Sequence, residues 1–201
     1  MDAKEWDARY AGSDLIWGSE PNRFVAEELH ALSPGRLLDV ACGEGRNAIW
    51  FARRGWQAVG VDFSVVAVDR ARRLAEQAEV AATTEFHVGD VVAGQLPEGR
   101  FDAVIVAYLQ LPPDRRTRAL GTAADRVAMG GTLLVVGHDR TNLTDGYGGP
   151  PDPAVLFSPQ DVLADIGKGF VARKAERVAR PVATPEGDRT AIDALVVATR
   201  G

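Results

Sequence analysis

The chain has 201 residues, is 46% hydrophobic and carries a formal net charge of minus 5. This length fits one compact domain, because single cores extend to roughly 250 residues. The acidic balance argues against a nucleic-acid partner, the lone Cys42 excludes a disulfide within the chain, and no stretch approaches the ~18 apolar residues of a membrane span. We expect a cytoplasmic protein with no membrane partner. Composition leaves the oligomeric state open.

The first 34 residues have a helical character. Trp6 and Tyr10 are four residues apart and would share one helix face. This spacing predicts an N-terminal helical segment over residues 1–34 that presents aromatic side chains to the rest of the molecule.

Short apolar runs alternate with helical patterns over the next hundred residues. The runs are bounded by Gly, Asp or Pro, which is typical of buried parallel strands. In the helical pattern after the second run, Val68, Ala71 and Ala75 fall on one face and Arg70 and Arg73 on the other. The predicted strands are residues 36–41, 57–62, 84–89, 101–108 and 131–137.

The pattern changes after the fifth strand. A Gly/Pro-rich loop covers residues 144–153, and Ser158, Pro159 and Asp161 then form the start signal of a helix. Residues 172–182 and 191–200 predict two final strands. The expected fold is a Rossmann-like, doubly wound α/β domain over residues 1–201. Its seven-stranded sheet is mostly parallel and has an antiparallel strand in the C-terminal hairpin.

The loop after the first strand has the geometry of a nucleotide-binding turn but not its usual residues. Gly43 and Gly45 permit a tight turn and close approach of a ligand. Ala48 stands where a dinucleotide fingerprint has its third glycine, and the loop has no lysine. Asp39 would repel a pyrophosphate but would suit a cationic amino-acid group. The loop therefore favours a nucleoside ligand that carries positive charge.

Three motifs in chain order carry a resemblance to a known family. They are DVACGEGRN at 39–47, VGVDFS at 59–64 and VGDVV at 88–92. With them the sequence resembles the class I S-adenosylmethionine-dependent methyltransferases. The resemblance implies S-adenosylmethionine as cofactor, S-adenosylhomocysteine as product and no metal. The cofactor residues that it implies are Asp39, Ala41, Gly43, Gly45, Asp62, Phe63, Asp90 and Val91.

Each acidic residue of these motifs has an expected partner. The family likeness places the methionine end of the cofactor at Asp39 and the adenine amino group at Asp90. An acid some 20 residues beyond the first loop, as Asp62 is, can also accept hydrogen bonds from both ribose hydroxyls. The alternative is that these acids only cap the helices that follow them.

The N-terminal segment resembles that of small-molecule methyltransferases of the tellurite-resistance and thiopurine type. This resemblance implies that residues 1–34 form a lid over a cofactor-binding half at 35–138. A substrate loop and hairpin at 139–201 would complete the site. Tyr10 and Trp17 would then lie near the sulfonium, because a cation over an aromatic face is favourable. The alternative for both aromatic residues is packing in the core.

Acceptor residues are expected at the ends of the fourth and fifth strands. Tyr108 and Gln110 follow the fourth strand, and His138 and Asp139 end the fifth. All four are candidates for the substrate pocket. His138 is the candidate catalytic base, with Asp139 as the residue that orients it. His30, His87 and Cys42 are expected to be structural, and the scattered histidines predict no metal site.

The predicted function is transfer of a methyl group to an oxygen, sulfur, nitrogen or chalcogen nucleophile of a small molecule. One alternative is a non-catalytic protein that binds S-adenosylmethionine or S-adenosylhomocysteine. A second is an NAD-dependent oxidoreductase, against which Asp39 and the missing third glycine argue.

Overall fold

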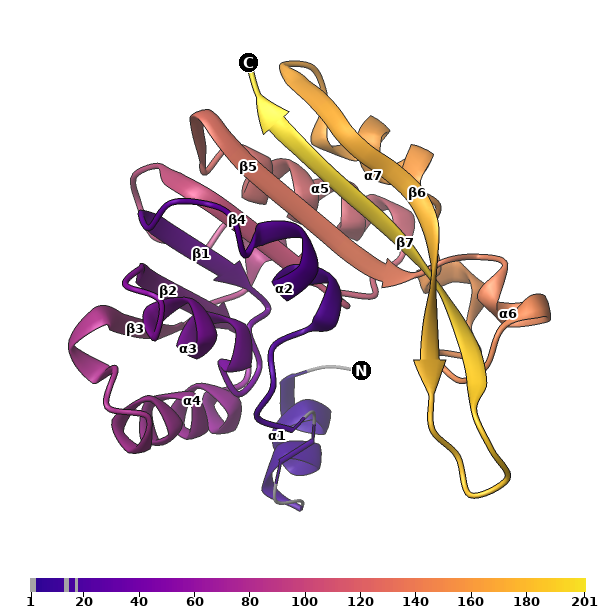
Figure 1. The fold of residues 1–201 in the computed structure, drawn as a ribbon, viewed down its shortest axis with the longest axis horizontal. Coiled ribbons are helices and arrows are strands. Elements are labelled where there is room, and N and C mark those ends of the chain that lie inside the picture. The colour runs from indigo at the N-terminus through magenta and orange to yellow at the C-terminus, as the bar shows by residue number, and fades with distance from the viewer. Residues whose placement is uncertain (1–2, 13–14, 17) are drawn as a thin grey trace.

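The structure is a computed structural model that describes residues 3–12, 15–16 and 18–201, so the expectation for Trp17 falls outside the described residues. One seven-stranded sheet runs through these residues, with helices on both faces (Figure 1). Its strands are β1 (Arg36–Val40), β2 (Gln57–Asp62), β3 (Thr84–Val88), β4 (Phe101–Ala107), β5 (Val127–His138), β6 (Phe170–Val182) and β7 (Arg189–Arg200).

The helices pack in two layers, which create two hydrophobic cores. The core on one face contains residues of α2 (Arg23–Leu29), α3 (Arg46–Ala52) and α4 (Val65–Gln77). The core on the other face contains residues of α5 (Pro113–Ala124) and α7 (Pro159–Ile166). The N-terminal α1 (Ala3–Ala11) contacts α4. The remaining short helices are η1 (Ala81–Thr83), η2 (Val91–Ala93), α6 (Asn142–Asp145) and η3 (Pro153–Val155).

The strand order is β3-β2-β1-β4-β5-β7-β6. The first five strands pair in parallel, and β7 runs antiparallel to both β5 and β6. The predicted fold is therefore confirmed. The strand order reverses between β1 and β4, and ligands of such sheets bind beyond the carboxyl ends of the strands at this point.

Local sequence explains several of these elements. The central strands β1, β4 and β5 read as near-continuous apolar runs because helices cover both of their faces. The helix start predicted at residue 158 is confirmed. Ser158 and Asp161 form a reciprocal capping box, with Pro159 at the first helical position of α7.

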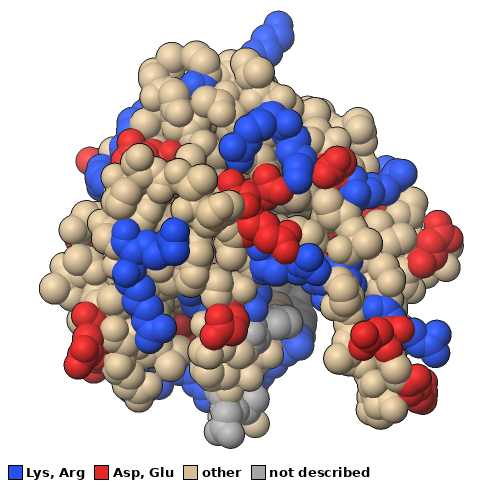
Figure 2. Space-filling view, in the orientation of Figure 1, with Lys and Arg blue, Asp and Glu red and all other residues tan. Residues whose placement is uncertain are grey.

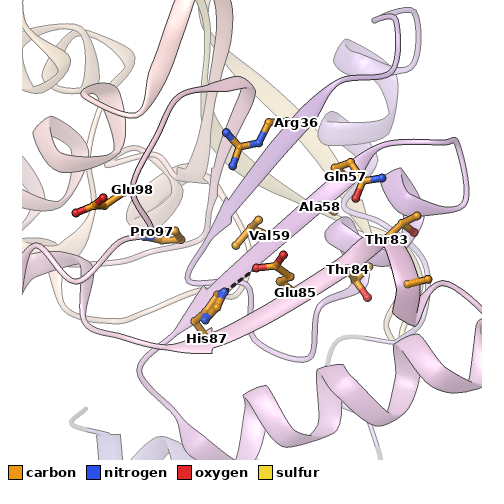
Figure 3. Close-up of a pocket in the computed structure, with 11 residues that line it drawn as sticks. Arg36, Gln57, Ala58, Val59, Thr83, Thr84, Glu85, His87, Pro97 and Glu98 are labelled. Carbon is orange, nitrogen blue, oxygen red and sulfur yellow. Dashed lines mark hydrogen bonds and ion pairs between the residues drawn. The ribbon is translucent and has the colours of Figure 1, made fainter.

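The connection from β3 to β4 is unusual because it contains only the short η2. A pocket of about 370 Å³ opens over the neighbouring part of the sheet (Figure 3). Arg36, Gln57 and Thr84, the first residues of β1, β2 and β3, line it together with the His87–Glu85 pair, whose side chains are 3.3 Å apart. This pocket lies at the amino ends of the strands, opposite the edge where a nucleoside would bind.

Candidate cofactor and acceptor site

Backbone strain marks the two strands at the reversal point. Ala41, just after β1, has a φ of 56°, and Tyr108, just after β4, has a φ of 58°. Residues other than glycine seldom adopt this left-handed region, and such strain persists where the surrounding structure enforces it, often at functional sites. Both positions were candidates from the sequence. The fold brings them to adjacent strand ends.

The glycine loop packs tightly against two neighbours. Gly43 and Gly45 have φ values of 55° and 79°. A Cβ on Gly45 would stand 2.7 Å from the ring of Phe86, and a Cβ on Gly43 would stand 2.8 Å from the hydroxyl of Tyr10. Tyr10 of α1 is buried over this loop, where the N-terminal segment was expected to lie.

Asp39 is a buried carboxylate without a hydrogen-bond partner. Only 1% of the residue is exposed, and neither carboxylate oxygen makes an aligned hydrogen bond to a described residue. Burial raises the pKa of Asp39 to about 7, and the nearby Asn47 amide and Arg46 guanidinium only partly oppose it. Leaving a buried polar group unpaired is costly, so an orphaned carboxylate beside a glycine loop fits a site that a cation completes.

Two charged residues of the loop were missed by sequence reasoning. Glu44 is buried, accepts a hydrogen bond from Arg70 at 2.9 Å and another from the backbone N–H of Ile16 at 3.1 Å, and thereby ties the N-terminal segment to the loop. Burial lowers the pKa of Arg46, while the negative charge of Asp39 raises it. The guanidinium of Arg46 therefore places a positive charge near the carboxylate of Asp39. In the sequence, only the positions of Glu44 and Arg46 inside the glycine motif indicated that they belong to the site.

Asp62 holds the turn after β2. Its two carboxylate oxygens accept hydrogen bonds from the backbone N–H groups of Gly43 and Ser64, each at 2.9 Å. Burial raises the pKa of Asp62, and these two hydrogen bonds oppose the effect. Ser64 in turn donates a hydrogen bond to Asp7 of α1 at 2.5 Å. The loops after β1 and β2 and the helix α1 thus form one connected unit.

Asp90 has the capping role that was the alternative to adenine binding. Its Oδ1 accepts a hydrogen bond from the N–H of Val92 at 2.8 Å, at the start of η2. Val91 beside it is buried. This cap occupies one carboxylate oxygen, so the contact with an adenine amino group remains a prediction for the other.

A polar cluster gathers at the carboxyl ends of β4 and β5. Asp193 of β7 lies at its centre and has no exposed surface. Its Oδ2 accepts hydrogen bonds from the Tyr108 hydroxyl and from Nε of Arg180, both at 2.7 Å. Nδ1 of His138 lies 3.2 Å from Oδ1, without the alignment of a hydrogen bond. We call Tyr108, His138, Arg180 and Asp193 the Asp193 cluster.

The electrostatics of the Asp193 cluster keep its carboxylate charged. Burial would raise the pKa of Asp193, but the contacts with His138, Arg180 and Tyr108 outweigh it and lower the pKa below its usual value. Burial and the negative charge of Asp193 raise the pKa of Tyr108. Tyr108 therefore stays protonated and serves as a donor.

The expectation that Asp139 orients His138 is wrong. Neighbouring residues of a strand point to opposite faces, and His138 and Asp193 are a directly opposed pair across β5 and β7. Asp139 is fully buried, bridges to Phe157 and accepts hydrogen bonds from Thr141 and from Nε of Arg177, the latter at 2.9 Å. Asp139 anchors the loop to β6 and faces away from the Asp193 cluster.

Gln110 joins backbone segments rather than presenting its amide to a pocket. Its Oε1 accepts a hydrogen bond from the N–H of His138 at 2.9 Å, and its Nε2 donates to the carbonyl of Val155 at 2.7 Å. The loop at 139–153 does cover the site in one place. A Cβ on Gly149 would lie 3.0 Å from the imidazole of His138, so this loop closes over that ring.

The three residues that were expected to be structural differ in burial. Cys42 is buried against Gly60, and burial raises its thiol pKa, so Cys42 is a packed residue. His30 and His87 are on the surface. Across residues 3–12, 15–16 and 18–201, no three His, Cys, Asp or Glu side chains gather as metal ligands. No helix within these ranges is long and apolar enough to cross a membrane.

Comparisons with known proteins show which family model and which proteins this chain resembles. Residues 37–131 match the family model described as a methyltransferase domain. The chain is 33% identical over 127 residues to demethylmenaquinone methyltransferase of Thermus thermophilus, covering 62% of this chain and 55% of that protein. It is 29% identical over 160 residues to 2-heptyl-1-hydroxyquinolin-4(1H)-one methyltransferase of Mycobacteroides abscessus, covering 72% and 70%.

The fold has solved counterparts. The structure of TehB from Haemophilus influenzae superimposes with a TM-score of 0.75 at 16% identity, covering 92% of this chain and 64% of that one. Sheet order and reversal point define a Rossmann-like domain. Residues 37–131 therefore resemble a methyltransferase domain, and the chain is similar in sequence to known methyltransferases. The aligned part spans only about half of the first relative.

Proposed function

We propose that this protein transfers the methyl group of S-adenosylmethionine to a small-molecule acceptor. The observation that carries the proposal is the buried, unpartnered carboxylate of Asp39 beside the glycine loop at the reversal point of the sheet. This carboxylate fits the ammonium of an amino acid and repels a pyrophosphate. Both named relatives are methyltransferases of small molecules, which supports an acceptor of that kind.

Each part of the cofactor has proposed partners. Asp39 would hold the ammonium, and the adjacent Arg46 is placed to hold the carboxylate, so that the zwitterion pairs with both side chains. Asp62 would turn its oxygens to the ribose hydroxyls, and Asp90 with Val91 would receive the adenine. When bound, S-adenosylmethionine supplies a methyl group on a positively charged sulfur. The backbone of Ala41 and the backbone of Phe63 are proposed to lie next to the cofactor.

The N-terminal segment is proposed as a lid. Asp7 hydrogen-bonds Ser64 in the loop after β2, and Tyr10 lies over Gly43 in the loop after β1. The helix α1 therefore rests on both loops that would contact the cofactor. Such a lid excludes water and limits the size of the acceptor. Tyr10 is the described aromatic residue best placed near the sulfonium.

Calorimetry with S-adenosylmethionine, S-adenosylhomocysteine and NAD tests the cofactor assignment first. We expect micromolar affinity for the first two, none for NAD, and a ten- to hundredfold loss in Asp62→Ala, because hydrogen bonds to a charged group contribute roughly 1.5–3 kcal/mol. Asp69→Ala, in an exposed ion pair on α4, is the matched control and should bind normally. Binding of NAD alone would refute the proposal.

His138 is the proposed general base. We expect His138→Ala to lower turnover about a hundredfold while cofactor affinity stays nearly unchanged, since a positioned base contributes roughly 10²–10⁴-fold. Turnover of a methyl acceptor also separates an enzyme from a protein that only binds the cofactor. Steady-state kinetics of His138→Ala measure this effect. Unchanged turnover would show that His138 is not the general base.

A further inference from the structure

The Asp193 cluster has features that the transfer of a methyl group does not by itself require. A nucleophile that already carries a free electron pair needs only alignment with the methyl group. This cluster instead combines a histidine, a guanidinium and a buried carboxylate on four strand ends. Such a combination suits an acceptor that arrives protonated and reacts as an anion.

All four side chains lie on the same face of the sheet. His138 and Asp193 are opposed across β5 and β7, and Arg180 lies two positions beyond the residue of β6 that pairs with Asp193. The guanidinium of Arg180 lies over the Tyr108 ring at 5.5 Å from its centre, and the Tyr108 and His138 rings are 5.1 Å apart. The four groups therefore face one small volume beyond the ends of β4 and β5.

Two side chains of the Asp193 cluster are partly exposed to solvent. Nδ1 of His138 is buried against Asp193, and the 13% of the His138 side chain that is exposed therefore lies at other atoms. The Arg180 side chain is 25% exposed. A hollow separates the β6–β7 hairpin from the lower body of the molecule (Figure 2). Lys and Arg atoms lie along the upper rim of this hollow.

We propose that the Asp193 cluster binds a weakly acidic hydroxyl group, such as a phenol or enol, as the methyl acceptor. This inference rests on the proposed function. Arg180 faces the acceptor oxygen and determines specificity, and Asp193 is a positioning residue that holds both Arg180 and His138. In the transfer, the acceptor O–H bond breaks and its proton passes to the imidazole of His138. The oxygen electron pair forms the new bond to the methyl carbon, and the broken S–C bond leaves its electron pair on sulfur.

Other acceptors would use this arrangement less well. A carboxylic acid is already ionised at neutral pH and needs no base, and a thiol ionises with less help than a phenol because reference thiol and phenol pKa values are about 8.5 and 10. A protonated amine would be repelled by Arg180. The pairing of a base with a cation therefore favours the hydroxyl.

The test uses 4-nitrophenol, whose phenolate absorbs visible light, and the full chain saturated with S-adenosylhomocysteine. We place the acceptor oxygen at Arg180 on the side away from the Asp193 carboxylate that raises the pKa of Tyr108. A cation within about 4–6 Å lowers the pKa of an acid by roughly 1–3 units, so the bound phenolate should be favoured at least about tenfold over the phenol. A pH titration of the absorbance measures this. Failure of S-adenosylhomocysteine to bind in calorimetry would instead overturn the proposed function.

Variants separate recognition from folding. Arg180→Gln should lose the tenfold preference and Arg180→Lys should keep most of it. Arg177→Gln, which removes the equivalent ion pair with Asp139 on the other face, should keep all of it. Asp193→Asn should weaken the preference in proportion to its loss of turnover. No binding of the probe, binding as the neutral phenol, or an equal loss in Arg177→Gln overturns the proposal.

Turnover gives a second, independent readout. A matched series of 1-naphthol, 1-naphthalenethiol, 1-naphthylamine and 1-naphthoate presents four acceptor atoms on one ring system. We expect methylation of the naphthol at least tenfold faster than that of the other three. Faster methylation of the thiol, the amine or the carboxylate would overturn the assignment of a hydroxyl acceptor.

Discussion

Asp39→Asn should stabilise the free protein at pH 8 and at the same time abolish tight binding of the cofactor. Burial raises the pKa of Asp39 from 3.8 to about 7, so the folded state holds a proton that the unfolded state has already lost. Folding stability therefore falls as the pH rises from about 4, and the full penalty is present above about 7. The neutral amide avoids that penalty, which amounts to about 4 kcal/mol for a pKa raised from 3.8 to about 7.

Thermal unfolding at pH 5 and pH 8, without cofactor, measures the stability effect. The variant should gain about ten degrees at pH 8 and about a third as much at pH 5, because about 1 kcal/mol corresponds to roughly 2–4 °C in a chain of this size. Cofactor affinity should fall at least tenfold, since a neutral amide loses the charge that attracts the ammonium. A variant that is less stable than the parent at pH 8 would mean that Asp39 is satisfied in the free protein.

The carboxylate of Asp39 should also make cofactor binding depend on pH. An ammonium beside Asp39 favours the charged carboxylate, so binding near pH 7 should release a proton. The calorimetric binding enthalpy should then differ between buffers of different ionisation enthalpy, and the difference should disappear in Asp39→Asn. Equal enthalpies in all buffers would contradict this linkage.

Gly45→Ala should be the most destabilising single change in the glycine loop. The φ of Gly45 is 79°, and a new Cβ would stand 2.7 Å from Phe86 and 2.9 Å from Ala71. A left-handed residue with a side chain costs about 1–2 kcal/mol, and overpacking a core adds about 1–3 kcal/mol. We expect a loss of about 3 kcal/mol, measured by denaturant unfolding.

Gly130→Ala is the matched control for this substitution. Gly130 has nearly the same conformation, with a φ of 76°, but a Cβ there would meet nothing within 4 Å. It should therefore cost only the conformational part, about 1–2 kcal/mol. Equal losses in the two variants would show that the contact with Phe86 and Ala71 contributes nothing.

The fold could be predicted because its signals are local. Buried parallel strands are nearly continuous apolar runs, and Ser158, Pro159 and Asp161 indicate the start of α7. The strand ends of the proposed cofactor site lie one per motif, so Asp39, Asp62 and Asp90 could be named as candidates in chain order. The sequence could not show that Asp90 caps η2 or that Asp62 already bonds Gly43, because both depend on loop conformation.

The acceptor end resisted prediction because its partners come from distant strands. Asp139 is adjacent to His138 in sequence but lies on the opposite face, whereas Asp193 is 55 positions later and directly opposite. One signal was present: Asp193 interrupts an apolar strand, and a charge at a buried strand position calls for a partner. Its register with β5 was not available from the sequence.

The division of the site along the chain has a consequence for how such proteins diversify. The proposed cofactor contacts after the N-terminal segment fall within residues 39–91, whereas Arg180 and Asp193 sit on the hairpin of β6 and β7. The family match ends at residue 131, before that hairpin begins. Substitutions in the hairpin can therefore change the acceptor while the donor end stays intact, so the two halves can evolve at different rates.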